Sequence, residues 1–255
     1  MSSRAVSGLP PHPQAPVVQR LRVRYAKRGR LRFTSHRDIQ RAVERALRRS
    51  GVPIAFSAGF SPHPKISYLG AAPTGTASEA EYLELGLADP REPDQVRRAL
   101  DAALPAGLDV LEVVEAGPGS LAERIDASSW RIRLDGIATV ELARAVALFL
   151  AAESLPVERL TKDGRRVLDA RAPVIRLVAG ADPDGCAILD LVVRHVTPAV
   201  RPDDVLAGLL AVADLVLPAP PTATRRAQGL LEETGRLADP LAPDRPADAT
   251  GPAAG

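Results

Sequence analysis

The stretch that decides the fold is residues 20–26, RLRVRYA, in which arginines alternate with Leu21, Val23 and Tyr25. A period of two is typical of a β-strand with one buried face. Because helices are expected to cover the apolar face, the arginines at positions 20, 22 and 24 are expected on the other side of the sheet. An open basic sheet face is how several ferredoxin-like modules hold RNA, although a merely solvated charged face has the same pattern.

The next segment predicts a helix. Ser35 and Asp38 form a start resembling a capping box, apolar residues recur at helical spacing from Ile39 to Leu47, and Ser50-Gly51 marks the end. Strands are expected at IAF and KISYL on either side of a loop, and at EYLELGL, then a helix at about 93–104 and a strand at about 108–114. This order, βαββαβ, is the ferredoxin-like unit.

The same order of elements recurs in the second part of the chain. Residues 130–134 alternate as a strand, residues 139–152 predict a helix, and a hairpin through Lys162-Asp163-Gly164 follows. A strand at AILDLVV, a helix starting at Arg201-Pro202-Asp203 and a strand near 225–230 complete the set. We therefore expect an α+β protein of two tandem ferredoxin-like domains, residues 19–115 and 130–230, with disordered tails at 1–18 and 231–255.

Composition limits the classes of function. The 255 residues are 45% hydrophobic and 25% charged, enough for two modest domains. No run of about 18 apolar residues and no secretory signal is present, so a cytoplasmic protein without a membrane partner is expected. The one cysteine, Cys186, excludes an intramolecular disulfide and an iron–sulfur cluster held by this chain alone. The net charge of +2 does not by itself indicate a nucleic-acid binder.

Two polar constellations are candidates for chemistry. In SAGFSPHPKISY (57–68), His63, Lys65 and Tyr68, with His36 upstream, could supply the general acid, base and cation of a metal-independent ribonuclease. The prolines on either side of His63 stiffen the loop, which suits a binding site as well as a structural crossover. Along the first helix, arginines recur at spacings of four and three, namely Arg37, Arg41, Arg45 and Arg48.

Three further features are weaker signals. Thr74, Gly75, Ser78, Glu79 and Glu81 combine small and acidic residues that allow close approach of a ligand, but a plain connection between strands is the better explanation of them. His195 stands alone and is interpreted as structural or superficial. No His, Cys, Asp or Glu spacing indicates a metal site.

A longer phrase, LRFTSHRDIQRAVERALRRSGVPIAFSAGFSPHPKISYLGAAPTGTASEAEYLEL, is more specific than its parts. Together with TKDGRRVLDAR and Arg201-Pro202-Asp203, it resembles the bacterial radical SAM-linked protein family, a domain of unknown function found beside or fused to radical S-adenosylmethionine proteins. The resemblance covers about residues 18–230. It implies a radical SAM protein as partner, which would hold the S-adenosylmethionine and the iron–sulfur cluster, and genomic neighbours that imply RNA or ribosome-associated proteins.

The element order also resembles the RNA-processing endonucleases of CRISPR systems, but their C-terminal glycine-rich loop is missing here. The leading hypothesis is therefore a non-catalytic accessory or RNA-binding protein, with a metal-independent endoribonuclease and a structural dimerisation module as alternatives. In the leading hypothesis, SAGFSPHPKISY is a binding loop that faces the start of the first helix. The candidate binding residues are Ser35, His36, Arg37, Arg45, Arg48, Arg49, Gly59, Phe60, His63, Lys65, Tyr68, Ser78, Glu79 and Glu81.

Overall fold

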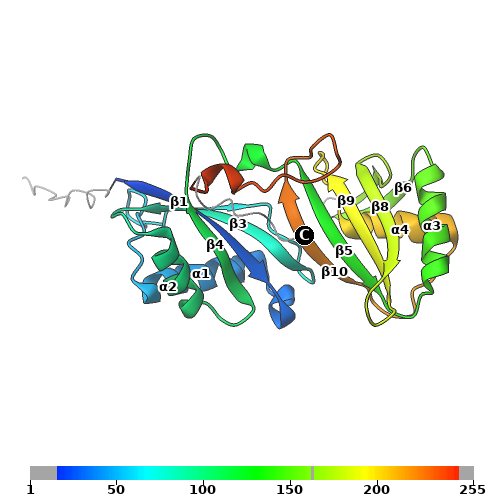
Figure 1. The fold of residues 1–255 in the computed structure, drawn as a ribbon, viewed down its shortest axis with the longest axis horizontal. Helices are drawn as coiled ribbons and strands as arrows, with labels where there is room; N and C mark the ends of the chain where they lie inside the picture. Colours follow the sequence, from blue (N-terminus) through cyan, green and yellow to red (C-terminus); the bar gives the residue numbers. More distant parts are fainter. Residues whose placement is uncertain (1–15, 162–163, 247–255) are drawn as a thin grey trace, which may run out of the picture.

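The computed structural model describes residues 16–161 and 164–246, which form an α+β structure around one large mixed sheet (Figure 1). The first half contains β1 (Gln19–Lys27), α1 (His36–Ser50), β2 (Ile66–Leu69), β3 (Ala77–Leu87), α2 (Pro93–Ala103) and β4 (Leu108–Glu115), with the short 3-10 helix η1 (Gly29–Phe33). The second half contains β5 (Ala127–Leu134), α3 (Thr139–Ala151), β6 (Pro156–Thr161), β7 (Gly164–Asp169), β8 (Val174–Ala181), β9 (Ala187–Arg194), α4 (Pro202–Ala213) and β10 (Thr222–Gly229). The 3-10 helices η2 (Ala122–Arg124) and η3 (Ala242–Asp244) lie outside these sets.

The sheet order is β4-β1-β3-β10-β5-β9-β8, and β2 pairs with β3. Within each half all neighbouring strands are antiparallel. The halves join where β3 and β10 run parallel, with Ala77 opposite Thr224 and Ser78 opposite Arg225. The sheet is therefore continuous, but each half contributes its own contiguous group of strands.

Most expected elements are present at the expected places. IAF is the exception in the first half, because Ile54 and Phe56 make only isolated bridges. In the second half, the expected hairpin forms a separate two-stranded sheet from β6 and β7, while β8 joins the main sheet as a strand of its own. The turn residues Lys162 and Asp163 lie outside the described residues.

The α-helices α1 to α4 all pack on one side of the sheet, here called the helix side. Leu21, Val23 and Tyr25 are buried there against α1 and α2, and a second core forms between β5, β9, α3 and α4. Ser35 caps α1 by accepting the Asp38 backbone N–H at 3.2 Å, and Gly51 ends the helix at a φ of 69°. Asp38 departs from the capping box, since its carboxylate accepts the Ser35 hydroxyl at 2.7 Å instead of reaching back to the backbone.

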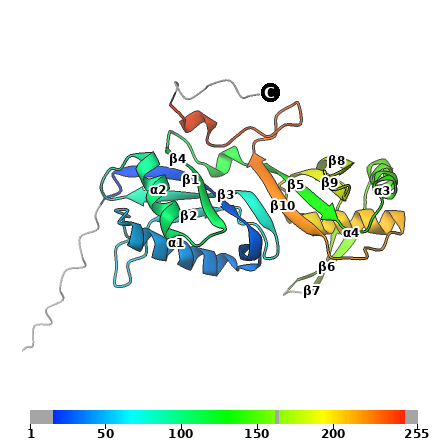
Figure 2. The same ribbon diagram turned by 60° about the horizontal axis from the view of Figure 1, so that its bottom comes forward.

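The expected disordered tail after residue 230 is wrong for residues 231–246. This C-terminal segment crosses the far side of the sheet, opposite α1, and η3 lies over the first half (Figure 2). Leu241 is fully buried beside Tyr82 and Leu121. The segment is rich in Pro, Ala and Asp, a composition typical of disorder, but the buried Leu241 side chain and the buried Asp244 carboxylate anchor it, together with the pair of Arg245 and Glu112.

The same segment closes the basic sheet face that the sequence predicts in the first half. Arg22 is only 1% exposed and donates to Asp244 at 2.7 Å, to the Gly119 carbonyl at 2.5 Å and to Glu84 at 3.3 Å. Arg20 pairs with Glu84 at 3.2 Å, and Arg24 donates to the Glu79 carbonyl at 3.0 Å. These arginines do lie opposite the helices, but Arg22 is buried, Arg20 is paired with Glu84, and Arg24 bonds a backbone carbonyl, so they do not form the open basic face that the alternation predicts.

In the part of the chain that the structure describes, no helix has both the length and the apolar character needed to cross a membrane.

Candidate functional site

A cleft of about 720 Å³ lies on the helix side where the two halves meet. Segments distant in sequence form its walls, and they are brought together by the pairing of β3 with β10. The lining residues are Gly70, Ala71, Pro73, Thr74, Ser128, Trp130, Val193, His195, Ala199, Val200, Arg201, Pro202, Asp203, Arg225 and Gln228. Cavities of this size accommodate a small ligand or a single nucleotide.

A buried ionic network forms the wall nearest the first half. Arg225 forms an ion pair with Glu81, and it donates to the Ser78 hydroxyl at 3.2 Å and to the Gly70 carbonyl at 2.6 Å. The other Glu81 oxygen accepts the Ala72 backbone N–H at 3.1 Å. Because Glu81, Ser78 and Arg225 are all buried, this network fixes residues 70–72 as a rigid wall and joins the halves. We refer to it as the seam.

Lys27 reinforces the seam from β1. Its ammonium group is buried and donates to the Pro73 carbonyl at 3.0 Å and the Ala72 carbonyl at 3.3 Å. Burial lowers the pKa of Lys27, and the nearby Glu81 carboxylate opposes that change. The lysine therefore holds the connection before β3 in place.

His195 offers a hydrogen-bonding group at the second wall. Its Nε2 lies 3.2 Å from the Ser128 hydroxyl oxygen, which also accepts the Trp130 indole N–H at 2.8 Å. Burial, and then the charge of Arg225, lower the pKa of His195. Since an indole N–H can only donate, the Ser128 hydroxyl proton is free to bond a neutral His195. The lowered pKa of His195 favours its neutral form, in which Nε2 can accept this proton.

The start of α4 places a free cation at the rim. The Arg201 backbone N–H donates to Asp204 at 2.7 Å, and Asp204 in turn pairs with Arg159 at 2.7 Å. Arg159 also donates to the Ala199 carbonyl at 3.0 Å, which holds the loop before α4. The Arg201 side chain itself is exposed and makes no ion pair with any described residue.

A basic surface on η1 and α1 leads away from the cleft. Residues 28–51 contain eight arginines and two acidic residues, a net charge of +6 in a chain whose total is +2. Four of these arginines are exposed and make neither an ion pair nor a side-chain hydrogen bond within the described chain, namely Arg30, Arg37, Arg45 and Arg48. We call these four the α1 strip. The Arg32 carbonyl accepts the Gly75 N–H at 2.7 Å, which ties the end of η1 to the residue after Thr74 in the wall of the cleft.

The other four arginines of this region have partners, and that of Arg32 is the Phe33 ring, with the guanidinium carbon 4.6 Å from the ring centroid. Arg28 pairs with Glu79 and with Asp109, Arg41 lies 3.5 Å from Asp38, and Arg49 donates to the Ala103 carbonyl at the end of α2. Arg49 therefore joins two helices, and Glu79 is bound to a cation within the protein. Both were predicted as binding residues, and their side chains are already engaged.

The loop SAGFSPHPKISY lies at the other end of β3 from the cleft. The Ser57 N–H donates to the His63 carbonyl and the Ser57 hydroxyl accepts the His63 N–H, so the loop is a tight projection whose tip, Phe60, is fully exposed. Gly59 sits there at a φ of 122°. The base of the loop bonds Gly86, about 26 Å along β3 from Ser78.

The expected meeting of the loop with the start of α1 occurs only at Tyr68, and His63 and Lys65 take no part in it. His36 contacts Tyr68 edge to face at a ring distance of 5.3 Å on the helix side, while Lys65 lies against Gly86 on the far side. His63 is exposed and makes no side-chain bond within the described chain. Positions 65 and 68 are three apart on an extended strand, so their side chains point to opposite faces. The four polar groups do not form one catalytic cluster.

His36 and Tyr68 are nevertheless unusual. The His36 Nδ1 and the Tyr68 hydroxyl are both buried without a hydrogen-bond partner among the described residues. Burial raises the pKa of Tyr68 far above its ordinary value, so the phenol stays neutral. Ser35 and Arg37, their neighbours on α1, lie at its first turn, where Ser35 caps the helix.

Sequence reasoning missed most of the cleft. Trp130, Arg201 and Arg225 were expected only as parts of strands and of a helix start, and His195 was interpreted as structural. The local signals were the Arg201-Pro202-Asp203 helix start and the segment from Thr74 to Glu81, which supplies one lining residue of the cleft and two members of the seam. Within residues 16–161 and 164–246, no three His, Cys, Asp or Glu side chains gather as a metal site would require.

Comparison with known proteins identifies a family but no activity. Residues 20–202 match the family described as an uncharacterized protein conserved in bacteria (DUF2344), and the chain belongs to this family. No curated protein matches the chain. Among solved structures, a putative glycine cleavage system transcriptional repressor is 12% identical over 80% of this chain and 95% of its own, with a TM-score of 0.22. DyPB from Rhodococcus jostii RHA1 is 12% identical over 75% of this chain and 82% of its own, with a TM-score of 0.18.

Proposed function

We propose that this protein is a non-catalytic, cytoplasmic RNA-binding accessory protein that presents RNA to a separate radical SAM enzyme. In this proposal each half is a ferredoxin-like unit. The strand orders β4-β1-β3-β2 and β10-β5-β9-β8 support that reading, because each follows from a βαββαβ chain with antiparallel neighbours. The single cysteine supports a partner that supplies the iron–sulfur cluster.

The observation that carries the RNA proposal is the α1 strip and its continuity with the cleft. Arg37 and Arg48 are eleven residues apart on one helix, so the strip extends for about 16 Å. Exposed arginines without internal partners bind phosphates at little cost, and release of counterions from the RNA supplies the affinity. A bound strand would follow α1 with its backbone and reach the cleft with a nucleotide.

The cleft supports recognition of an unpaired nucleotide. Arg201 is placed to contact a phosphate at the rim, and the neutral His195 and the Ser128 hydroxyl are placed to bond a base edge. Trp130 is almost fully buried beneath Arg225, at 5.5 Å from its guanidinium carbon, and offers little surface for stacking. Recognition by hydrogen bonds therefore fits this cleft better than a stacking platform does.

The geometry favours binding over RNA cleavage. The endoribonuclease alternative requires a histidine, Lys65 and Tyr68 in one cleft, and Lys65 and Tyr68 lie on opposite faces of the sheet. His36 contacts Tyr68 without the lysine that would stabilise a developing phosphorane charge. The accessory role needs no such convergence.

RNA binding can be tested with a fluorescently labelled single-stranded 20-nucleotide RNA and anisotropy at several salt concentrations. Arg45→Ala with Arg48→Ala should weaken binding and make the log–log salt slope shallower by about 1.4, since each lost phosphate contact on a single strand contributes about 0.7. The matched control is Arg97→Ala with Arg98→Ala on α2, which removes the same charge from arginines that pair with Asp94. Equal weakening by both pairs would overturn the proposal.

The partner role needs its own experiment. Affinity purification of the tagged protein from its native cells, followed by mass spectrometry, should recover a radical SAM protein. If RNA binding is intact and no radical SAM protein is recovered under crosslinking, the accessory role is wrong and the RNA-binding role remains.

A further inference from the structure

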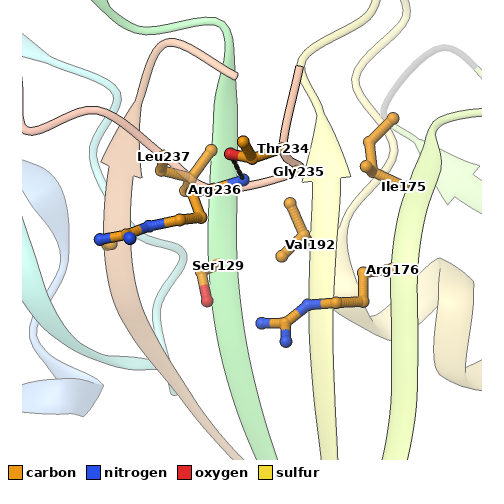
Figure 3. A pocket seen from close by; sticks show the side chains of 9 residues that line it. Ser129, Ile175, Arg176, Val192, Thr234, Gly235, Arg236 and Leu237 are labelled. Carbon is orange, nitrogen blue, oxygen red and sulfur yellow. Dashed lines mark hydrogen bonds between the residues drawn. The ribbon is translucent and has the colours of Figure 1, made fainter. Parts of the chain in front are cut away.

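A second cavity, a groove of about 450 Å³, lies on the far side of the sheet in the second half. It is separate from the α1 strip and from the cleft, both of which are on the helix side. Its floor and one rim come from four strands of the sheet (Figure 3). They consist of Ser129 of β5, Val192 of β9, Ala227 of β10, and Ile175 and Arg176 of β8. Residues 234–237 of the C-terminal segment form the roof.

The roof is held by backbone geometry. After β10 the chain makes a tight turn in which the Glu232 N–H donates to the Arg236 carbonyl at 2.9 Å and Leu231 pairs with Leu237. Gly229 allows the return, because a Cβ atom there would lie 1.8 Å from the Ala238 carbonyl oxygen. Arg236 is therefore placed over the sheet by a turn that is fixed at both ends.

Two arginines reach into this groove from different elements. Arg176 comes from the floor and Arg236 from the roof, and Ser129 lies between their side chains in Figure 3. Both are exposed, and neither makes an ion pair within the described residues. In contrast, Arg131 and Arg133 on the same face pair with Asp190 and Asp135, each at 2.8 Å.

The carboxylates of the turn do not neutralise the pair. Glu232 accepts the Thr234 hydroxyl at 3.2 Å, and Glu233 is exposed without an ion pair to either arginine in the described chain. The floor between the arginines is apolar, and Val192 is only 2% exposed. The groove thus combines two uncommitted guanidinium groups, one hydroxyl and an apolar floor.

We propose that this groove binds the phosphoryl group of a small organic phosphate. Arg176 and Arg236 donate to its oxygens from opposite sides, since a planar guanidinium bonds phosphate through paired N–H groups. The Ser129 hydroxyl donates a further hydrogen bond, and the body of the ligand rests on Val192 and Ile175. A phosphate carries enough acceptors and charge to satisfy both arginines, which a single carboxylate does less well.

Isothermal titration calorimetry at fixed ionic strength tests this site with inorganic pyrophosphate, uridine 5′-monophosphate and uridine. Pyrophosphate and uridine 5′-monophosphate should bind the wild-type protein, and uridine should not. Arg176→Ala with Arg236→Ala should weaken both by about tenfold or more, because two charge-assisted contacts are lost. Arg226→Ala removes an exposed, unpaired arginine of β10 outside the groove and should leave binding within about twofold.

The controls separate this site from the RNA proposal. Arg45→Ala with Arg48→Ala should not change pyrophosphate binding, whereas it should weaken RNA binding. Thermal unfolding of the groove variant should match the wild type, which excludes a folding defect. Binding of uridine as tight as that of its phosphate, unchanged binding by the groove variant, or no binding of millimolar pyrophosphate would each overturn the proposal.

Discussion

The C-terminal segment covers the far side of the sheet to a different extent in each half of the molecule. In the first half the C-terminal segment covers Arg22 of β1, which is buried against Asp244. In the second half the same segment forms only a narrow roof, and Arg176 and Arg236 remain without ion pairs in the described chain. Arginines on a sheet face thus stabilise the fold or stay available for a ligand, depending on which chain segment returns over them.

The largest expected loss of stability concerns the seam, which joins the two halves into one sheet. Glu81→Ala should lower the free energy of unfolding by about 3–5 kcal/mol, because Arg225 is left buried without its ion-pair partner. Urea denaturation measures this loss. Glu79→Ala is the matched control, since Glu79 pairs with the exposed Arg28 and its loss should cost no more than about 1 kcal/mol. Similar losses for both would show that the seam is not the structural junction.

The next effect compares two leucines of the C-terminal segment. Leu241→Ala should cost about 2–4 kcal/mol, because Leu241 is fully buried over the first half. Leu237→Ala, at the groove of the second half, should cost less than about 1 kcal/mol because Leu237 is only partly buried. Denaturation curves of the two variants give the difference directly, and equal losses would contradict the contrast between a covered and an open face.

A third comparison substitutes one arginine on each face. Arg22→Ala should cost about 2 kcal/mol, because it removes one of the two arginines that bond the buried Asp244. Arg176→Ala should change stability by less than about 0.5 kcal/mol, as expected for an exposed side chain without an ion pair. If Arg22→Ala were as mild, the C-terminal segment would contribute no cover in solution.

The smallest effect is the response of the covered face to acid. Burial alone would raise the pKa of Asp244, but bonds from Arg22, Arg124 and the Gly117 N–H together lower it below the ordinary 3.8. A carboxylate with a lowered pKa stabilises the folded state above its ordinary pKa, and this contribution is lost as the pH falls through the folded value. Unfolding midpoints measured downward from pH 5 should therefore fall less steeply for Asp244→Asn than for wild type. Parallel curves would mean that Asp244 is not paired.

Periodicity was enough to predict the individual elements. The alternation in RLRVRYA and the apolar spacing from Ile39 to Leu47 give β1 and α1, because burial of one face leaves a period in the sequence. The cleft could not be predicted in this way. It depends on Ser78 meeting Arg225 across 147 positions, and neither residue carries a local sign of that pairing.

Two predictions from the sequence, one for the C-terminal segment and one for the loop at 57–68, were wrong for reasons that a few residues explain. The C-terminal segment was expected to be disordered, since Leu241 and Asp244 are too few to give a periodic signal, although both are buried. The loop is expected to hold His63 and Lys65 toward the start of the first helix, but Lys65 lies on the far side of the sheet, because successive residues of an extended strand point to opposite faces. Whether the predicted residues bind a ligand stays a prediction, as does the division into two domains.

Trp130 gives the protein an intrinsic optical probe. It is the only tryptophan in the sequence, and its indole bonds Ser128 next to His195 while its ring lies under Arg225. Its fluorescence therefore originates at the contact between the halves and at the wall of the cleft. A shift of its emission to longer wavelength before global unfolding would show that the halves separate. A change in its emission intensity during titration with a ligand would show that the cleft is being filled, and neither measurement needs an added label.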